Sequence, residues 1–227
     1  MEGGSTFGGQ TFFIQGDNLG ADDSVINSVR YWSTLSNFTA ECKMETPHSV
    51  LRCTSDEGTG FNHRWQITAG FQNSMLYHSN TSYGPPVLTS FRRPGVGADQ
   101  QFEMSKMDTR GSENIEITGT QFGSVKDNAI SSVKFGRSGT TQKFFASDCR
   151  VVVDHVKIEC LTGVGTGTDL EWLVSIDGQV SVSPRTGFHP PKITKLFGKG
   201  VEDGRSIGGD EVFIEGQYFG IVGDHVQ

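Results

Sequence analysis

The chain has 227 residues, of which 30 are glycine and only 34% are hydrophobic. This length fits one or two domains, with buried side chains spaced among many turns. The net charge of −7 argues against a nucleic-acid partner, which usually needs a basic surface. No apolar run is long enough to cross a bilayer, so we expect no membrane contact within the chain. The first residues lack the features of a secretory signal, so a secreted protein would be represented here by a mature or partial sequence.

One sequence pattern occurs three times. An alternating strand is followed by a glycine, and then by an apolar residue directly before a second glycine; the copies occupy residues 9–20, 112–123 and 209–220. The closing glycines are at 20, 123 and 220, so the spacings of 103 and 97 residues are those of whole domains. The alternation is typical of a half-buried strand, and we expect Leu19, Phe122 and Phe219 to fill the core.

The four cysteines form two pairs with equal spacing. Cys42 and Cys53 are 11 residues apart, as are Cys149 and Cys160, and the pairs are offset by 107 residues. This symmetry predicts the disulfides Cys42–Cys53 and Cys149–Cys160, with four free buried thiols as the alternative. Zinc is less expected because the chain contains no Cys-x-x-Cys.

Each cysteine pair flanks a predicted β-hairpin. A two-residue turn at Asp154-His155 places three pairs opposite each other on one face: Val153 and Val156, Val151 and Ile158, and Cys149 and Cys160. A turn at Pro47-His48 likewise places Met44 opposite Leu51 and Cys42 opposite Cys53. Directly opposed residues on antiparallel strands come close enough for a disulfide.

Paired cysteines favour an oxidising compartment. Two glycosylation sequons, Asn37-Phe38-Thr39 and Asn80-Thr81-Ser82, agree with this. We therefore expect an extracellular or cell-surface protein, glycosylated at Asn37 and Asn80.

The order of these motifs resembles that of the immunoglobulin-like IPT/TIG domain. The residues that carry the resemblance in the second repeat are Pro86 to Phe91, Ile115 to Gly123, Val133 to Gly136, Cys149 to Cys160, Gly165 to Gly167 and Leu173 to Gln179. The resemblance implies an all-β chain of tandem immunoglobulin-like β-sandwiches with about seven strands each. The repeats would cover residues 1–84 and 85–189, and residues 190–227 would form the first strands of a partial third repeat.

The repeats depart from the family pattern at both ends. The first lacks the leading Pro-x-Ile-Thr strand, and the third contains only the first two strands. A missing strand leaves an open sheet edge, so one hypothesis is a filament whose copies join head to tail by strand complementation. The alternative is that the sequence is a piece of a longer tandem array. The candidate interface residues are Phe13, Phe213, Ile193, Leu196 and Ile214.

No catalytic set, cofactor motif or metal site is evident. The glycine-rich Gly163 to Gly167 lacks the lysine and helix of a phosphate-binding loop. Asp17, Asp22 and Asp23 could hold calcium, but a solvated acidic loop is the favoured interpretation. Trp65 and Trp172 could stack on sugars, but their equivalent positions favour a place in the core or between domains.

The sequence leaves three functions open, none of them enzymatic. The first is an extracellular structural or adhesive protein, either a spacer or a filament subunit. The others are a receptor fragment that binds a protein ligand and a non-catalytic carbohydrate-binding module. The expected partners are further copies of the chain or neighbouring immunoglobulin-like domains, with glycans as a further option.

Overall fold

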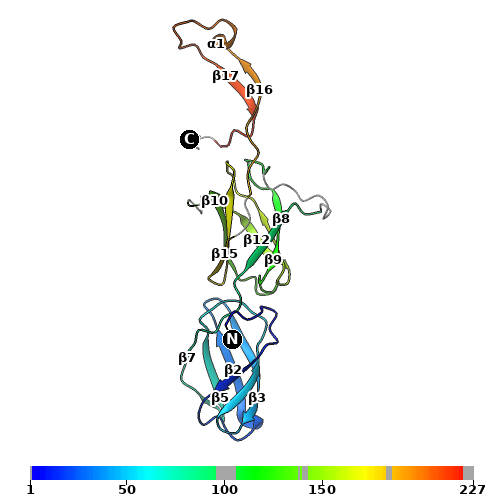
Figure 1. Ribbon diagram of the computed structural model, residues 1–227, viewed down its shortest axis with the longest axis vertical. Helices are drawn as coiled ribbons and strands as arrows, with labels where there is room; N and C mark the ends of the chain where they lie inside the picture. Colours follow the sequence, from blue (N-terminus) through cyan, green and yellow to red (C-terminus); the bar gives the residue numbers. More distant parts are fainter. Residues whose placement is uncertain (1, 96–105, 138, 140–142, 183–185, 222–227) are drawn as a thin grey trace.

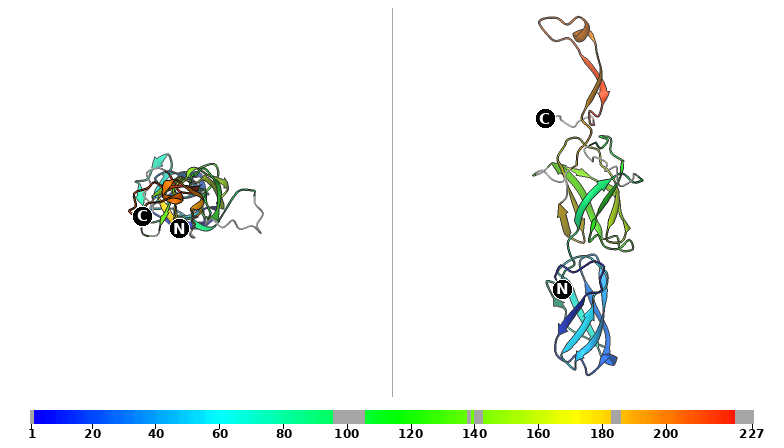
Figure 2. Two further views of the ribbon diagram at one scale, coloured as in Figure 1. Left: turned by 90° about the horizontal axis from the view of Figure 1, so that it is seen from above. Right: turned by 45° about the vertical axis from the view of Figure 1, so that its right-hand side comes forward.

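The computed structural model describes residues 2–95, 106–137, 139, 143–182 and 186–221. Two β-sandwiches lie end to end, and a β-hairpin extends beyond the second one (Figures 1 and 2). Strands make up 49% of the described residues and helices 3%, so the predicted all-β fold class is confirmed. No helix in the described ranges is long and apolar enough to span a bilayer.

The first sandwich has seven strands, and hydrogen bonds link them in the order β1-β4-β3-β2-β5-β6, with β7 also on β5. The long β3 connects both layers, because its first residues pair with β2 and its last residues with β4. The hydrogen bonds therefore form one continuous sheet where two were expected. The strands are β1 (Thr11–Gln15), β2 (Ile26–Trp32), β3 (Asn37–Thr46), β4 (Val50–Thr54), β5 (Arg64–Ala69), β6 (Gln72–Asn73) and β7 (Tyr77–His78), and the 3-10 helix η1 (Asp23–Val25) precedes β2.

The second sandwich consists of two separate four-stranded sheets, β11-β10-β14-β15 and β12-β13-β9-β8. The leading strand β8, which has no counterpart in the first sandwich, pairs with β9. The strands are β8 (Val87–Arg92), β9 (Asn114–Thr120), β10 (Ile130–Arg137), β11 (Phe144–Phe145), β12 (Ser147–Val153), β13 (Lys157–Leu161), β14 (Leu170–Ile176) and β15 (Gln179–Val182).

The two sandwiches have cores of the same design. Trp65 stacks on Tyr31 with ring centroids 4.3 Å apart, and Trp172 stacks on Phe135 at 4.2 Å. Each indole N–H donates to a threonine hydroxyl, Thr81 at 2.8 Å and Thr186 at 2.7 Å. Both tryptophans are buried, so they belong to the core and are no platforms for sugars.

The repeated motif makes the same bend after β1, β9 and the last strand, β17 (Phe213–Gln217). The residues in its left-handed conformation are Asn18, Gln121 and Tyr218, with φ of 59°, 66° and 62°. Leu19 and Phe122 are buried in the two cores, as predicted. Phe219 is 44% exposed, which corrects its predicted core position; among the described residues, no second sheet covers its hairpin.

The hairpin consists of β16 (Lys192–Phe197) and β17 (Phe213–Gln217), with the short helix α1 (Lys199–Glu202) between them. Every residue of β16 is exposed. The two strands therefore form a sheet without a core of its own. Residues 222–227 of the predicted third repeat lie outside the described residues.

Candidate functional site

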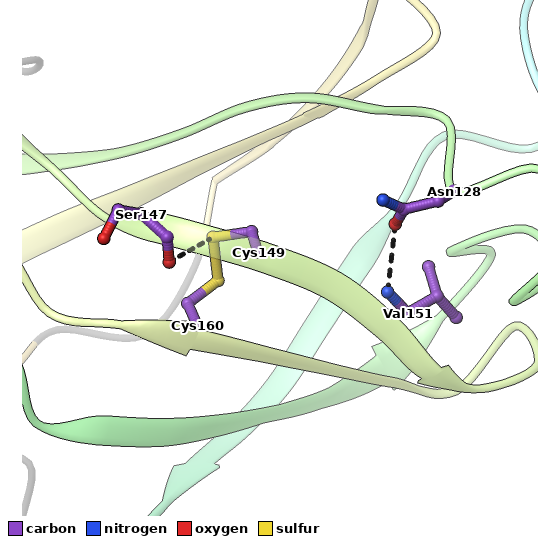
Figure 3. Close-up of a disulfide and its surroundings, with 5 residues drawn as sticks. All are labelled: Asn128, Ser147, Cys149, Val151 and Cys160. Atoms are coloured by element: carbon purple, nitrogen blue, oxygen red, sulfur yellow. Dashed lines mark hydrogen bonds between the residues drawn. A yellow bond between two sulfur atoms is a disulfide. The ribbon is translucent and has the colours of Figure 1, made fainter.

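Both predicted disulfides are present. Cys42 bonds to Cys53 and Cys149 to Cys160, with Cα atoms 4.0 and 4.2 Å apart. Cys53 and Cys160 are buried, and their partners pack against the core edge. Figure 3 shows the second bond joining the neighbouring strands β12 and β13. Each disulfide thus cross-links the two strands of one hairpin at the edge of its sandwich's core.

The predicted register is present in the middle of both hairpins, but the ladder shifts near both turns and again between Ser147 and Arg150, beside Cys149. Cys42 faces Cys53 and Met44 faces Leu51, and in the second hairpin Val151 faces Ile158. Val153 pairs with Lys157 instead of Val156, because the ladder shifts between Val151 and Val153. The shift turns Val153 away from the core, and its side chain is 46% exposed.

The turn of the second hairpin inserts into the first sandwich. His155 lies at this turn and is only 2% exposed, and its Nδ1 is 2.9 Å from Oγ1 of Thr6. Its Nε2 lies 3.8 Å from a carboxylate oxygen of Glu57, and its ring lies 4.0 Å from that of Phe7. The equivalent His48 of the first hairpin is exposed. Among the described residues, His155 contacts the neighbouring sandwich, whereas His48 lies at the end of the first sandwich that faces away from it.

A second group of contacts joins the sandwiches through Asp177, in the turn between β14 and β15. Its carboxylate accepts hydrogen bonds from the Ser33 hydroxyl, from the Leu35 N–H at 3.2 Å and from the Thr59 hydroxyl at 3.4 Å. Asp177 is 2% exposed. A buried carboxylate needs such hydrogen-bond donors. The three donors therefore fix where Asp177 can lie against the first sandwich.

Gln121 provides a third contact from the bend after β9. Its side-chain oxygen accepts hydrogen bonds from both the N–H and the hydroxyl of Thr6, each at 2.9 Å. The connection between the sandwiches is also fixed, because Tyr83 N–H donates to the Gly60 carbonyl and Gly84 N–H to the Gly4 carbonyl. Pro85 and Pro86 follow directly and restrict the backbone further.

Two glycines approach the neighbouring sandwich so closely that a Cβ could be added only if the facing threonine shifted. A Cβ on Gly123 would lie 2.6 Å from Cγ2 of Thr59. In the bend that follows the hairpin's last strand, a Cβ on Gly220 would lie 2.7 Å from Cγ2 of Thr166. Thr166 follows Thr59 by 107 residues, the offset of the cysteine pairs. One close approach of the first junction, that of a bend glycine to a threonine methyl group, thus recurs at the second.

Two of the acidic residues near the first bend accept hydrogen bonds from nearby groups of the first sandwich. Asp22 accepts hydrogen bonds from the N–H and hydroxyl of Ser24, which lower its pKa. Asp23 accepts a hydrogen bond from the Met44 N–H. In the described part of the chain, no three His, Cys, Asp or Glu side chains come together as a metal site would require.

The predicted interface residues are all exposed in the single chain. Their exposed fractions are 60% for Phe13, 49% for Phe213, 57% for Ile193, 49% for Leu196 and 54% for Ile214. Phe213 stacks on Phe197 across the hairpin.

At the position in β9 that corresponds to Phe213, Glu116 pairs with Arg92 and Lys157. Burial alone would raise the pKa of Glu116, but hydrogen bonds from these two cations outweigh it and lower the pKa.

Sequence reasoning missed the junction. Thr6, His155 and Asp177 are polar residues in predicted turns, and nothing in a single sequence links Thr6 to a residue 149 positions away. The available signal was a difference between the repeats, because Asp177 stands where the first repeat has Gly70. The sequon residues Asn37 and Asn80 are both exposed, as modification would require.

Comparisons with known proteins identify no family. No protein-family description and no curated protein matches the chain. Among solved structures, a surface glycan-binding protein from Prevotella bryantii is 16% identical, with a TM-score of 0.45 over 77% of this chain and 36% of its own. SGBP-B from a complex xyloglucan utilization locus in Bacteroides uniformis is 13% identical, with a TM-score of 0.32 over 82% of this chain and 46% of its own.

A third similar structure is a type I pullulanase from Bacillus subtilis in complex with maltose. It is 11% identical, with a TM-score of 0.33 over 84% of this chain and 26% of its own. The chain spans less than half the length of each of these three proteins. Likenesses of this strength have no bearing on substrate or partner.

Proposed function

We propose that this protein is an extracellular or cell-surface structural protein in which immunoglobulin-like sandwiches of IPT/TIG type are held end to end in a fixed orientation. Its modules would be residues 1–84 and 85–189, with a third beginning at 190–227. The observation that carries the proposal is the contact of Gly123 with Thr59, which recurs between Gly220 and Thr166. A contact that recurs at both junctions sets one orientation for each step along the array.

The polar contacts at the junction support a fixed orientation. Domains in one chain move relative to one another unless their interface prevents it. Here Asp177, Thr6 and His155 are each less than 3% exposed and are all hydrogen-bonded across the boundary. Separating the sandwiches would break these bonds, and any tilt that kept the groups buried would leave them unpaired.

The chemistry of the chain favours a role for its surfaces over a reactive centre. The most buried histidines, His63 and His155, lie next to threonine oxygens, and their side chains are almost inaccessible to solvent. The two disulfides and the two exposed sequons favour the cell exterior.

Small-angle X-ray scattering of the purified chain, together with electron microscopy of single particles, tests the proposal. We expect a rod with one end-to-end length that does not change with salt concentration. A broad distribution of angles between the two sandwiches would contradict a spacer of fixed geometry.

A filament is the second candidate, favoured by the outer edge of β1. In the described residues no strand pairs with that edge, whereas β9 and β17 are covered by β8 and β16. Strand addition by the hairpin of another copy would cover both β1 and the exposed Ile193 and Leu196. Sedimentation velocity across a wide concentration range tests this form: growing polymers support it, and monomers at every concentration exclude it.

A further inference from the structure

The outer face of the first sandwich contains a groove beside Trp32. The groove has a volume of about 480 Å³, and the side chains that matter for its chemistry are Arg30, Trp32, Asn37, Thr39 and Gln66. It lies across three neighbouring strands, β3, β2 and β5. Trp32 is half-buried there, whereas Trp65 and Trp172 are buried in the cores.

The strand register fixes how these side chains lie. Asn37 is the direct partner of Trp32, while Thr39 is the partner of Arg30. On its other side, Arg30 is the partner of Gln66. Directly opposed side chains on one face have Cβ atoms about 5 Å apart, so a group attached to Asn37 starts within reach of the Trp32 ring.

We propose that Asn37 carries an N-linked glycan whose first sugar packs on the Trp32 ring and hydrogen-bonds to Arg30 and Gln66. The inference rests on the proposed extracellular placement. The new bond joins Asn37 Nδ2 to C1 of the sugar, and the bond from C1 to the diphosphate of a polyprenyl-linked oligosaccharide breaks. The amide gives up one proton, and polyprenyl diphosphate leaves.

The groups in the groove suit a sugar. The apolar C–H face of a pyranose ring can cover the exposed part of an indole, and its hydroxyls can accept from a guanidinium and an amide. Arg30 is exposed, and within the described ranges its guanidinium has no side-chain hydrogen bond or ion pair. A covalently attached sugar is always present at high effective concentration, so even weak contacts would hold it in the groove.

The second sequon provides a matched control. Asn80 is also exposed, but it lines a different depression, together with Phe61 and with Gln179 and Val180 of the second sandwich. A glycan on Asn80 would therefore lie away from Trp32. Any effect specific to the Asn37 glycan should be absent when only Asn80 loses its sugar.

The test compares the secreted chain from eukaryotic cells with its Asn37→Gln and Asn80→Gln variants. Glycopeptide mass spectrometry gives the occupancy of each sequon, and acrylamide quenching of tryptophan fluorescence reports mainly on Trp32. We expect Asn37→Gln to increase the quenching and lower the unfolding midpoint, and Asn80→Gln to leave the quenching unchanged. In a Trp32→Ala background, Asn37→Gln should no longer lower the midpoint.

Three outcomes would overturn the inference. They are an unoccupied Asn37, an occupied Asn37 with unchanged quenching, and binding of free oligosaccharide to the groove of a chain that stays unmodified at Asn37. The spacer proposal is judged separately, by the scattering of unglycosylated protein. A rigid rod with an empty Asn37 would refute the glycan alone.

Discussion

Nδ1 of His155 lies 2.9 Å from Oγ1 of Thr6, although the two residues are 149 positions apart in the sequence. Both side chains are buried, His155 at 2% and Thr6 at 0% exposure. A hairpin turn, ordinarily a solvent-exposed part of a sandwich, is thus part of the interior of the junction. This contact and those of Asp177 make the junction open to direct mutational tests.

Gly123→Ala should disrupt the junction. The new Cβ would meet Cγ2 of Thr59 at 2.6 Å, and Gly123 has a φ of 77°, which a side chain disfavours. We expect a wider distribution of angles between the sandwiches in scattering and microscopy. Gly95→Ala is the control for backbone strain alone, because Gly95 has a φ of 79° and no atom of the described residues lies within 4 Å of its added Cβ.

A second change should restore the junction of Gly123→Ala. Thr59→Ser removes the methyl group that the new Cβ meets and keeps the hydroxyl that donates to Asp177. We expect the double variant to recover part of the rod-like scattering. If Thr59→Ser gives no recovery, the contact between these two residues does not set the orientation.

Asp177→Ala should loosen the junction without unfolding either sandwich. The change leaves the donors of Ser33, Leu35 and Thr59 without their acceptor, at a cost of about 1–3 kcal/mol. Limited proteolysis near the connecting Pro85-Pro86 should become faster. Asp17→Ala, an exposed aspartate at the far end of the first sandwich, is the control and should leave the cleavage rate unchanged.

Trp172→Ala should strongly destabilise the second sandwich. It removes a side chain of 0% exposure that stacks on Phe135, and such truncations cost about 3–5 kcal/mol. Urea denaturation should show the second sandwich unfolding at a lower concentration. Trp65→Ala should act on the first sandwich instead, and equal effects of both variants on one shared transition would indicate that the two sandwiches unfold together.

The first sandwich should lose stability as the pH falls below about 6.5. Burial lowers the pKa of His63 from its ordinary value of 6.5, so the unfolded chain binds a proton that the folded one resists. The contribution of His63 is therefore complete above pH 6.5 and decreases as the pH falls toward its depressed pKa. His63→Gln should reduce the change in the unfolding midpoint between pH 7.5 and pH 5.5. His48→Gln, at an exposed site, should leave that change as it is in the unaltered protein.

The sequence was informative where the chain repeats itself. Equal spacing of the cysteines predicted both disulfides. Equal offsets predicted equivalent packed positions for Trp65 and Trp172, and both lie in the cores. Alternation could not reveal the shift that exposes Val153, because a bulge depends on backbone pairing. The junction could not be predicted for a related reason. The hydrogen-bond donors to Asp177 belong to the other sandwich and are far from it in the sequence.

The buried turn at His155 also makes the arrangement of the sandwiches polar. The second sandwich presents its hairpin turn to the first, and the first presents its own turn, with the exposed His48, at the opposite end. Each sandwich therefore has a distinct head and tail. Any assembly built by this contact can grow only with all its units pointing the same way.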